Sequence, residues 1–370
     1  MTWNSVPLGK VVTFQRGYDL PHHARKRGSV PIVSSAGVTD YHNVSMVNPS
    51  GVVTGRYGTI GEIFFVTEPF WPLNTTLYVR DFHGNDPRFV YYLLHRFDFH
   101  SFSGKSGVPG VNRNDLHLES VTLPENIDEQ RAIAAALSDV DALLEGLTRL
   151  IAKKRDLKQA AMQQLLTGQS RLPGFSGEWE MKRLGDLAKI QRGASPRPID
   201  SPVWFDENSS IGWVRISDVT CSGMFLYETT QRLSVLGVKH SRPVATGSLI
   251  MSICATVGRP IITRIDVCIH DGFVVFDNLD ANQLFVYYVL KWIEPDWTRH
   301  GQTGSQMNLN TGLINGTVIK LPPRAEQTAI AAVLSDMDAE LSALVARRDK
   351  TRDLKQAMMQ ELLTGRIRLV

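Results

Sequence analysis

The chain has 370 residues, of which 43% are hydrophobic and 21% are charged, and its formal net charge is +3. This composition is typical of a folded protein with room for two domains, and it excludes a disordered chain. No apolar run approaches the roughly 20 residues of a membrane helix, and the first residues lack the pattern of a signal peptide. We therefore expect a cytoplasmic protein. The mild charge argues against a small DNA-binding module that works alone, because such modules are usually more basic.

The three cysteines, Cys221, Cys254 and Cys268, are an odd number without close spacing. They predict neither a disulfide framework nor a zinc site, because both need paired or closely spaced cysteines. We expect a buried structural role for all three. The adjacent His22 and His23 point apart and lack a third ligand at helical spacing, so no metal site is predicted.

Residues 1–124 predict a mixed α/β domain. Short β-branched and aromatic runs at residues 11–14, 63–66 and 76–79 are typical of strands. Asp86 before Pro87 predicts a helix over the following run, with an aspartate cap and proline in its first position.

Residues 125–172 predict one long helix. Its apolar residues alternate steps of four and three, which places them in one seam: Ile133, Leu137, Val140, Leu144, Leu147 and Ile151. Asn126 and Glu129 have the spacing of a capping box at its start, and Gly168 stands where a left-handed residue ends a helix. The seam loses its strict heptad near Lys153 and resumes, shifted, at Leu157, Ala161 and Leu165, as a stutter would produce.

Residues 173–322 predict a second mixed α/β domain, with strands at 248–253 and 274–276 and a helix that begins near Asn282. Residues 323–370 predict a second long helix, in which Pro323 replaces the capping asparagine and Gly365 marks the end. Its seam consists of Ile330, Leu334, Met337, Leu341 and Leu344.

The two long helices are copies of one segment. Residues 129–172 match residues 326–369 without a gap, and 28 of the 44 positions are identical. Chance would give roughly three identities, so the chain contains an internal duplication. Upstream landmarks recur as well, while the sequence between them differs: Trp3, Arg16-Gly17 and residues 89–92 return as Trp179, Arg192-Gly193 and residues 285–288. The pattern indicates a shared frame around two different inserts.

The length of the helices predicts how they pair. About 40 residues make a rod of roughly 60 Å, which is too long to bury its seam against a small domain. Each helix therefore needs a partner helix, and the obvious partner is its own copy. The first helix leads directly into the second domain at residues 172–174, so no linker exists for a parallel pair. We predict an antiparallel coiled coil within a pseudo-two-fold internal repeat.

Sequence signatures of catalysis are missing. Gly104-Lys105-Ser106 has the end of a phosphate-binding loop, but Phe99 stands where that motif requires its first glycine. We find no glycine-rich cofactor fingerprint, no Asn-Pro-Pro-aromatic methyltransferase motif and no acidic-x-Lys nuclease motif. We therefore predict no catalytic residue, no metal and no cofactor on this chain.

Glycine-containing loops carry the candidate DNA contacts. The loop at residues 55–61 places Arg56 and Tyr57 where a cation and an aromatic ring suit phosphate approach and base contact. Its counterpart in the second domain keeps Arg259. Each candidate can equally belong to a solvated turn, and the remaining ones are Lys105, Arg113, Arg299 and Gln302. The acidic pairs Asp139/Asp141 and Asp336/Asp338 either bind a partner or solvate the helix, and we favour solvation.

Several motifs together carry a family resemblance: GRYGTIG at residues 55–61, EPFWPLNTTLYV at 68–79, FVYYLL at 89–94, and LP followed by EQRAIAAALSDVDALL, RDLKQA and LLTG. With two variable domains separated and followed by near-identical helices, the chain resembles the specificity (S) subunit of type I restriction-modification systems. The resemblance covers essentially the whole chain, and the duplicated helix is its specific part.

The resemblance implies a non-catalytic DNA-binding subunit. Residues 1–124 and 173–322 would be target recognition domains, each reading one half of a bipartite, asymmetric double-stranded DNA sequence. The helices at 125–172 and 323–370 would be spacers that set the gap between the halves. Two methyltransferase (modification) subunits and the restriction subunits would be partners, and S-adenosylmethionine, ATP and Mg would belong to them. Two alternatives stay open: a non-catalytic protein-interaction scaffold on an antiparallel coiled coil, and a fused restriction-modification enzyme.

Overall fold

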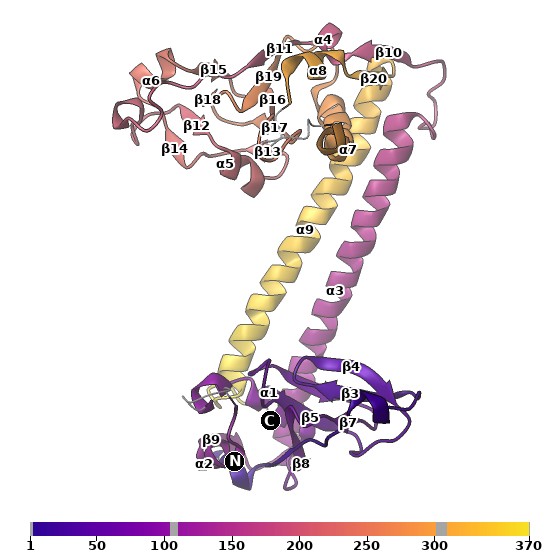
Figure 1. The fold of residues 1–370 in the computed structure, drawn as a ribbon, viewed down its shortest axis with the longest axis vertical. Helices are drawn as coiled ribbons and strands as arrows, with labels where there is room; N and C mark the ends of the chain where they lie inside the picture. Colours follow the sequence, from indigo (N-terminus) through magenta and orange to yellow (C-terminus); the bar gives the residue numbers. More distant parts are fainter. Residues whose placement is uncertain (1–2, 104–109, 301–308, 370) are drawn as a thin grey trace. The chain divides into compact units, whose positions relative to one another are not determined.

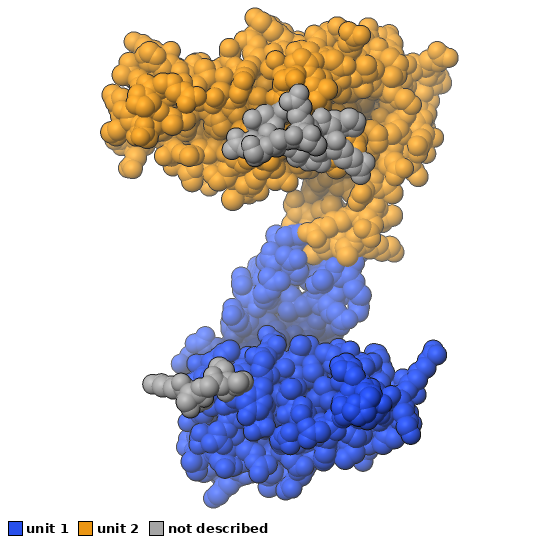
Figure 2. All heavy atoms as spheres, viewed as in Figure 1, with its two compact units in different colours: residues 1–150, 345–370 blue, residues 151–344 orange. Residues whose placement is uncertain are grey.

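The computed structural model describes residues 3–103, 110–300 and 309–369, without the side chains of residues 298–300. By packing, the chain divides into unit 1, residues 1–150 with 345–370, and unit 2, residues 151–344 (Figure 2). Each unit contains one mixed α/β domain and a part of both long helices, α3 (Ile127–Thr167) and α9 (Arg324–Leu362) (Figure 1). None of the described helices has the length and apolar character that a membrane-spanning segment requires.

Unit 1 has a central antiparallel sheet in the order β2-β8-β5-β6. Its strands are Thr13–Arg16 (β2), Gly51–Gly55 (β5), Ile63–Val66 (β6) and Thr76–Asp81 (β8). A second sheet, β4-β3-β7, and a ribbon of β1 with β9 flank it. These strands are Trp3–Pro7 (β1), Val30–Ser34 (β3), Gly37–His42 (β4), Trp71–Pro72 (β7) and Ser120–Pro124 (β9). The helices of the domain are α1 (Pro87–Leu94) and α2 (Arg113–Leu118).

Unit 2 repeats this frame with different additions. Its central sheet has the order β11-β19-β16-β17-β13, and the first four strands are antiparallel like those of unit 1. They are Lys189–Arg192 (β11), Phe273–Asp277 (β19), Leu249–Ser252 (β16) and Pro260–Thr263 (β17), followed by Phe225–Leu226 (β13). A second sheet contains Gln231–Arg232 (β14), Gly212–Val214 (β12), Val267–Ile269 (β18) and Arg242–Val244 (β15). A ribbon pairs Glu180–Arg183 (β10) with Val318–Leu321 (β20).

The shorter helices of unit 2 are Leu184–Leu187 (α4), Ile216–Cys221 (α5), Val235–Lys239 (α6), Gln283–His300 (α7) and Thr311–Gly316 (α8). Cys268 is buried and Cys254 is half-buried, but Cys221 at the end of α5 is exposed. The expectation of a buried role is therefore wrong for Cys221, because a short surface helix carries it.

The predicted cap of α1 is confirmed, and so is the predicted start of α7 near Asn282. The carboxylate of Asp86 accepts a hydrogen bond from the amide of Phe89 at 2.8 Å, with Pro87 in the first turn. The side chain of Asn282 accepts the equivalent bond from the amide of Phe285 at 3.1 Å. These caps satisfy amides that a helix start leaves without partners.

The long helices run antiparallel inside each unit. In unit 1, Glu129 and Asp141 of α3 pair with Arg368, beyond the end of α9, and with Lys355 of α9. Residue numbers in these pairs rise along α3 while they fall along α9, so the two helices have opposite directions. In unit 2, Lys158 of α3 pairs with Asp338 of α9, and Arg171, beyond α3, pairs with Glu326. The predicted direction is therefore confirmed within each unit (Figure 1).

The apolar seam is most deeply buried where each helix leaves its domain. Ile133 and Leu137 are buried with Leu362 and Leu363 in the core of unit 1, and Ile330 and Leu334 are buried in the core of unit 2. Leu147 and Ile151 are buried too, while the other predicted seam residues are half-buried: Val140, Leu144, Met337, Leu341 and Leu344. Leu157 is 48% exposed, so the predicted continuation there is wrong. The burial continues at Met162, Leu165 and Leu166 in the core of unit 2, and Ala161 packs against this core, so the predicted resumption is confirmed at Ala161 and Leu165.

A buried carboxylate closes each unit. The guanidinium of Arg368 donates to Glu129, with one bond of 2.7 Å, and the indole of Trp3 donates to the same carboxylate at 3.4 Å. In unit 2, Arg171 and Trp179 hold Glu326 in the same way, at 2.6 and 3.2 Å. Glu129 and Glu326 are the same position of the repeat, and so are Arg171 and Arg368. We name these two sets of contacts the carboxylate anchors.

One prediction about the ends of the long helices is wrong and another is confirmed. Glu129 does not form the predicted capping box, because its carboxylate binds Arg368 and Trp3; the side chain of Asn126 instead accepts from the amide of Asp128 at 2.9 Å. Gly168 and Gly365 have φ angles of +72° and +73°, as the predicted helix ends require. Arg368 lowers the pKa of the Glu129 carboxyl from its usual value.

Replacing Arg368 by alanine is expected to lower the free energy of unfolding by about 3 kcal/mol, because it leaves the buried Glu129 carboxylate without its counter-ion. Chemical denaturation monitored by tryptophan fluorescence measures the change. Arg366→Ala is the matched control, since Arg366 pairs with Glu361 on the exposed surface and its loss should cost less than about 1 kcal/mol. Equal effects of the two variants would contradict a special role of the anchor.

Candidate nucleic-acid interface

Equivalent edges of the two central sheets, one in each unit, carry loops. In unit 1, β2 and β5 end at this edge and β8 begins there, because neighbouring strands are antiparallel. In unit 2, β11, β16 and β19 are arranged in the same way. We call these segments the loop edge: residues 16–19, 56–61 and 73–75 in unit 1, and residues 192–197, 254–259 and 270–272 in unit 2.

The repeated Arg-Gly pair lies at the start of each loop edge, and close backbone approach explains its glycine. A Cβ atom on Gly17 would lie 2.1 Å from the carbonyl oxygen of Leu73, and one on Gly193 would lie 2.1 Å from the carbonyl oxygen of His270. Only glycine lets the two segments pass this closely. The motif that sequence comparison identifies as a recurring landmark is therefore part of the frame that holds the loops.

Arg56 and Tyr57 directly follow β5 in the loop edge of unit 1. Their amides donate to the carbonyl of Thr75 at 2.8 and 3.1 Å. The Arg56 guanidinium lies over the Tyr57 ring, 4.5 Å from its centre, and both side chains are half-exposed. The cation and the ring thus form one partly exposed surface, and the backbone hydrogen bonds to Thr75 fix its position.

The start of α2 joins this surface. The amide of Val111 donates to the carbonyl of Arg56 at 2.9 Å, and Gly110 forms a β-bridge with Tyr57. A Cβ on Gly110 would lie 2.1 Å from the Tyr57 ring, so a glycine is required there. Arg113 is exposed in the first turn of α2 and donates to the carbonyl of Phe14 at 3.4 Å. The structure therefore brings Arg56, Tyr57 and Arg113, predicted from separate motifs, onto adjoining segments.

Arg259 of unit 2, which the sequence predicts as a counterpart of Arg56, lies in a different environment from Arg56. Its Nε atom lies 3.3 Å from Oε1 of Glu294, and the ammonium group of Lys291 lies 2.5 Å from Oε2 of the same carboxylate. These contacts favour a structural role for Arg259. Lys105 and Gln302 lie outside the described residues, and so does the side chain of Arg299.

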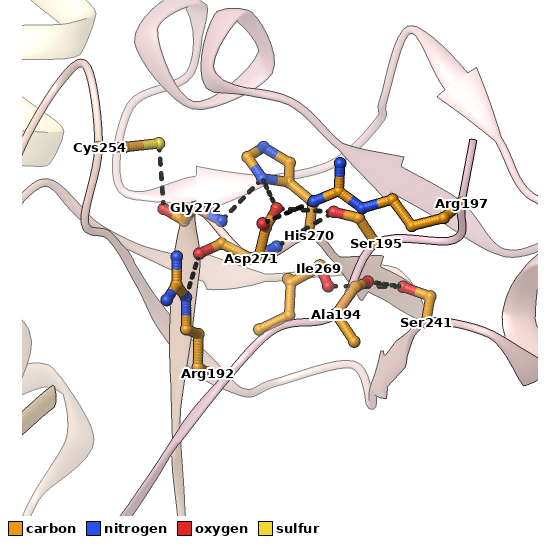
Figure 3. A network of polar contacts seen from close by, with 10 residues as sticks. All are labelled: Arg192, Ala194, Ser195, Arg197, Ser241, Cys254, Ile269, His270, Asp271 and Gly272. Carbon is orange, nitrogen blue, oxygen red and sulfur yellow. Dashed lines mark hydrogen bonds and ion pairs between the residues drawn. The ribbon is translucent and has the colours of Figure 1, made fainter. Parts of the chain in front are cut away.

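Sequence reasoning missed a polar network in the loop edge of unit 2, which joins the segment after β11 to the segment after β18 (Figure 3). Asp271 is its centre. One carboxylate oxygen accepts from the Ser195 hydroxyl at 2.7 Å, and the other accepts from Arg197 at 3.3 Å. Arg192 donates to the backbone carbonyl of Asp271 at 2.6 Å. The recurring Arg192-Gly193 pair was the available signal, but its partner Asp271 is far away in the sequence.

The neighbours of Asp271 do not form a nucleophilic site. Nδ1 of His270 accepts from the amide of Gly272 at 2.9 Å, and the thiol of Cys254 is directed to the carbonyl of Gly272 at 3.7 Å (Figure 3). Burial lowers the pKa of His270 and raises the pKa of Cys254, which favours neutral forms of both. No thiolate–imidazolium pair is built here. Within the described residues, no group of three or more His, Cys, Asp and Glu side chains could hold a metal ion.

A cavity of about 570 Å³ lies in unit 2 and includes His270 in its lining. Trp213 and Phe205 supply aromatic walls, while Arg215 and Gln231 supply polar groups. The Arg215 guanidinium donates to the Gln231 amide oxygen. This guanidinium–amide pair was not among the predicted contacts, because nothing in the local sequence places residue 215 beside residue 231.

Comparison with known proteins identifies a matching family model and relatives that cover most of the chain. The family model for the "Type I restriction modification DNA specificity domain" matches residues 1–153 and 176–351. A putative type I restriction enzyme MjaX specificity subunit of Methanocaldococcus jannaschii is 25% identical over 77% of this chain and 69% of its own length. The MjaVIII specificity subunit of the same organism is 23% identical over 71% of this chain and 66% of its own length.

Two solved structures share the fold. The S subunit of a type I restriction-modification system from M. genitalium matches 98% of this chain and 96% of its own, with a TM-score of 0.67 and 15% identity. A chain from a structure that describes complex assembly and conformational transition of the type I R-M system matches 98% of this chain and 97% of its own, with a TM-score of 0.60 and 18% identity. Both cover both units and both long helices.

The Asp271 network yields a prediction for the unit 2 loops. Asp271→Asn removes the charged acceptor of Ser195 and Arg197, so the amides of Gly193, Ala194, Ser195 and Arg197 should exchange with solvent several-fold faster. Hydrogen exchange detected by mass spectrometry measures this. Asp266→Asn is the control, since Asp266 holds Thr246 and not this segment. Unchanged exchange of residues 193–197 in the Asp271 variant would contradict the proposed role of the network.

Protonation of Asp271 at low pH should reduce the protection of the same segment against amide exchange. The Ser195 hydroxyl lowers the pKa of Asp271 below its usual value. The stabilisation is then fully present above the unfolded-state pKa of an aspartate, about 3.9, and is lost as the pH falls through the lower folded-state pKa. The part of this protection that depends on ionisation of the Asp271 carboxyl should therefore not change between about pH 5 and 8.

Proposed function

The chain belongs to the family of type I restriction modification DNA specificity domains, and from this membership we propose that it is the DNA-recognition subunit of a type I restriction-modification complex. In this proposal each α/β domain reads one half of a bipartite DNA sequence, and the paired helices separate the two readers. The chain performs no chemistry itself, and methyltransferase and restriction subunits assemble on it. S-adenosylmethionine, ATP and Mg are bound by those partners.

The observation that carries the proposal is a constant frame with variable loops. Both units have the same four antiparallel strands, the same helix caps and the same carboxylate anchor. Their loop edges differ: one presents Arg56 and Tyr57, and the other presents Ser195 and Arg197. Different side chains on equal frames are what two readers of different half-sites require, because base edges are distinguished by donor and acceptor patterns.

The net charge of +3 also fits a subunit that shares its contacts with partners. A protein-interaction scaffold is not favoured, since the relatives that match most of the chain are named as specificity subunits. A fused enzyme would need catalytic motifs that the sequence lacks.

The proposal predicts a methylation pattern. Co-expression of this chain with the modification subunit from its own genome should methylate adenines in one asymmetric sequence made of two specific halves and a nonspecific gap. Long-read sequencing that detects modified adenines measures the pattern. The modification subunit without this chain is the control and should leave the DNA unmethylated. Methylation without this chain, or at a single continuous motif, would contradict the proposal.

Arg56 provides a test of the reader in unit 1. Arg56→Ala should weaken binding of the assembled complex to its target by about 5- to 150-fold, because a base-reading arginine contributes about 1–3 kcal/mol. Fluorescence anisotropy with duplex DNA at fixed salt measures the affinity. Arg149→Ala is the control, since Arg149 pairs with Glu145 on the exposed face of α3. Loss of discrimination in the unit 2 half-site, with the unit 1 half-site unaffected, would show that the assignment is wrong.

A further inference from the structure

A partly buried aspartate joins three helices in unit 1. The hydroxyl of Tyr92, on α1, donates to Oδ2 of Asp141, on α3, at 2.7 Å. The ammonium group of Lys355, on α9, lies 2.6 Å from Oδ1 of the same carboxylate and 5.6 Å from the centre of the Tyr92 ring. One carboxylate therefore links the reading domain to both long helices.

Unit 2 contains the same cluster. The hydroxyl of Tyr288, on α7, donates to Oδ2 of Asp338, on α9, at 2.8 Å. Lys158, on α3, pairs with Oδ1 and lies 5.5 Å from the centre of the Tyr288 ring. We name the two sets the Tyr–Asp–Lys clusters. The agreement of atoms and distances between them shows that the geometry belongs to the frame and not to either insert.

Each Tyr–Asp–Lys cluster combines both copies of the repeat. Asp141 and Asp338 are equivalent positions, and so are Lys158 and Lys355. The tyrosine and the aspartate come from one copy, and the lysine comes from the other copy. The favoured interpretation of Asp141 and Asp338 as solvated residues is therefore wrong. Asp139 and Asp336, two positions earlier, are exposed.

The clusters add direction to contacts that are mainly apolar, beside the hydrogen bonds that Gln130 and Gln327 make at the starts of α1 and α7. The packing of Leu93, Leu137 and Leu363 in unit 1 stabilises the association, but apolar burial has no preferred orientation. A hydrogen bond is strong only over a narrow range of distance and angle. The rings of Tyr92 and Tyr288 are buried, so their hydroxyl groups have no bulk water to replace the carboxylate. Burial also raises the pKa of Tyr92, which keeps its hydroxyl group protonated and donating.

We propose that the Tyr–Asp–Lys clusters are positioning contacts that determine which gap length between the two half-sites the complex accepts. The inference rests on the proposed function, because a gap exists only if each unit reads one half-site. Each cluster fixes the axial and rotational position of its reading domain on the helix pair within its own unit. Without the clusters, the apolar contacts and the polar contacts near the helix starts would hold the domains but permit small shifts farther along the helix pair, and targets with altered gaps would become acceptable. Buried polar contacts that set register in helical assemblies act by the same physical principle.

The test uses the complete complex with its modification subunits. The substrates are duplexes that carry both half-sites, separated by the native gap or by a gap one or two base pairs shorter or longer. The variant is Tyr92→Phe with Tyr288→Phe, which removes two hydroxyl groups and keeps the rings. The initial methylation rate on each duplex gives a gap-length profile.

The wild-type complex should prefer the native gap strongly. In the double variant, the ratio of the methylation rate on the native gap to the rate on altered gaps should fall roughly tenfold, mainly because altered gaps react faster. The variant should still recognise both half-site sequences. Asp139→Asn with Asp336→Asn is the matched control and should leave the profile unchanged. Lys355→Met with Lys158→Met should broaden the profile as well, and Lys355→Arg with Lys158→Arg should restore it, since arginine keeps the charge and the donors.

Other outcomes separate the two ideas. An unchanged profile in folded, assembled Tyr→Phe and Lys→Met variants overturns the positioning role and leaves the proposed function intact. Equal loss of rate on every duplex also overturns it, because that result indicates a stabilising role alone. A wild-type complex that ignores the gap, or recognises only one half-site, refutes the proposed function and the inference with it.

Discussion

The burial of one glutamate in each unit is the constraint on which the remaining packing depends. A carboxylate without water is costly unless charged and hydrogen-bonding partners surround it. Glu129 obtains them from Arg368 and Trp3, and Glu326 obtains them from Arg171 and Trp179. The partners come from the end of one long helix and from the first strand region of a domain. Satisfying the charge therefore requires the domain and both helices to be in place together.

On this frame, the sheet edges are free to differ. The glycines at positions 17 and 193 keep two backbones close, and this close approach positions the following loops without specifying their side chains. In unit 1 the loop edge presents an arginine on a tyrosine ring, and in unit 2 it presents serine and arginine around a carboxylate. Stability and recognition are thereby assigned to separate parts of each unit, which permits change in one without loss of the other.

Features that depend on local pattern could be predicted from the sequence. The duplication, the long helices, their antiparallel direction, the cap at Asp86 and the helix start near Asn282 follow from residues that are neighbours in the chain. Contacts between distant residues were not predictable in this way. Glu129 resembled a capping residue because its partner Arg368 is 239 positions away, and Asp141 resembled a solvated residue because Lys355 belongs to the other copy. The Asp271 network was missed for the same reason, and Leu157 is exposed although it matches the apolar spacing.

Each copy of the long helix carries both members of the two pairs that recur in the units: glutamate near its start with arginine after its end, and aspartate in one half with lysine in the other. These recurring pairs join the two copies in the same way in both units, as in an isologous interface, and only the Lys154–Glu340 pair among the inter-helix ion pairs of the described residues lacks a counterpart. This self-complementarity has an evolutionary consequence. A recombination event that replaces one reading domain brings no new helix interface to be adapted, so new DNA specificities can arise by exchange of domains. A substitution in one helix copy, by contrast, must remain compatible with the other, which explains why the helices stayed alike while the readers diverged.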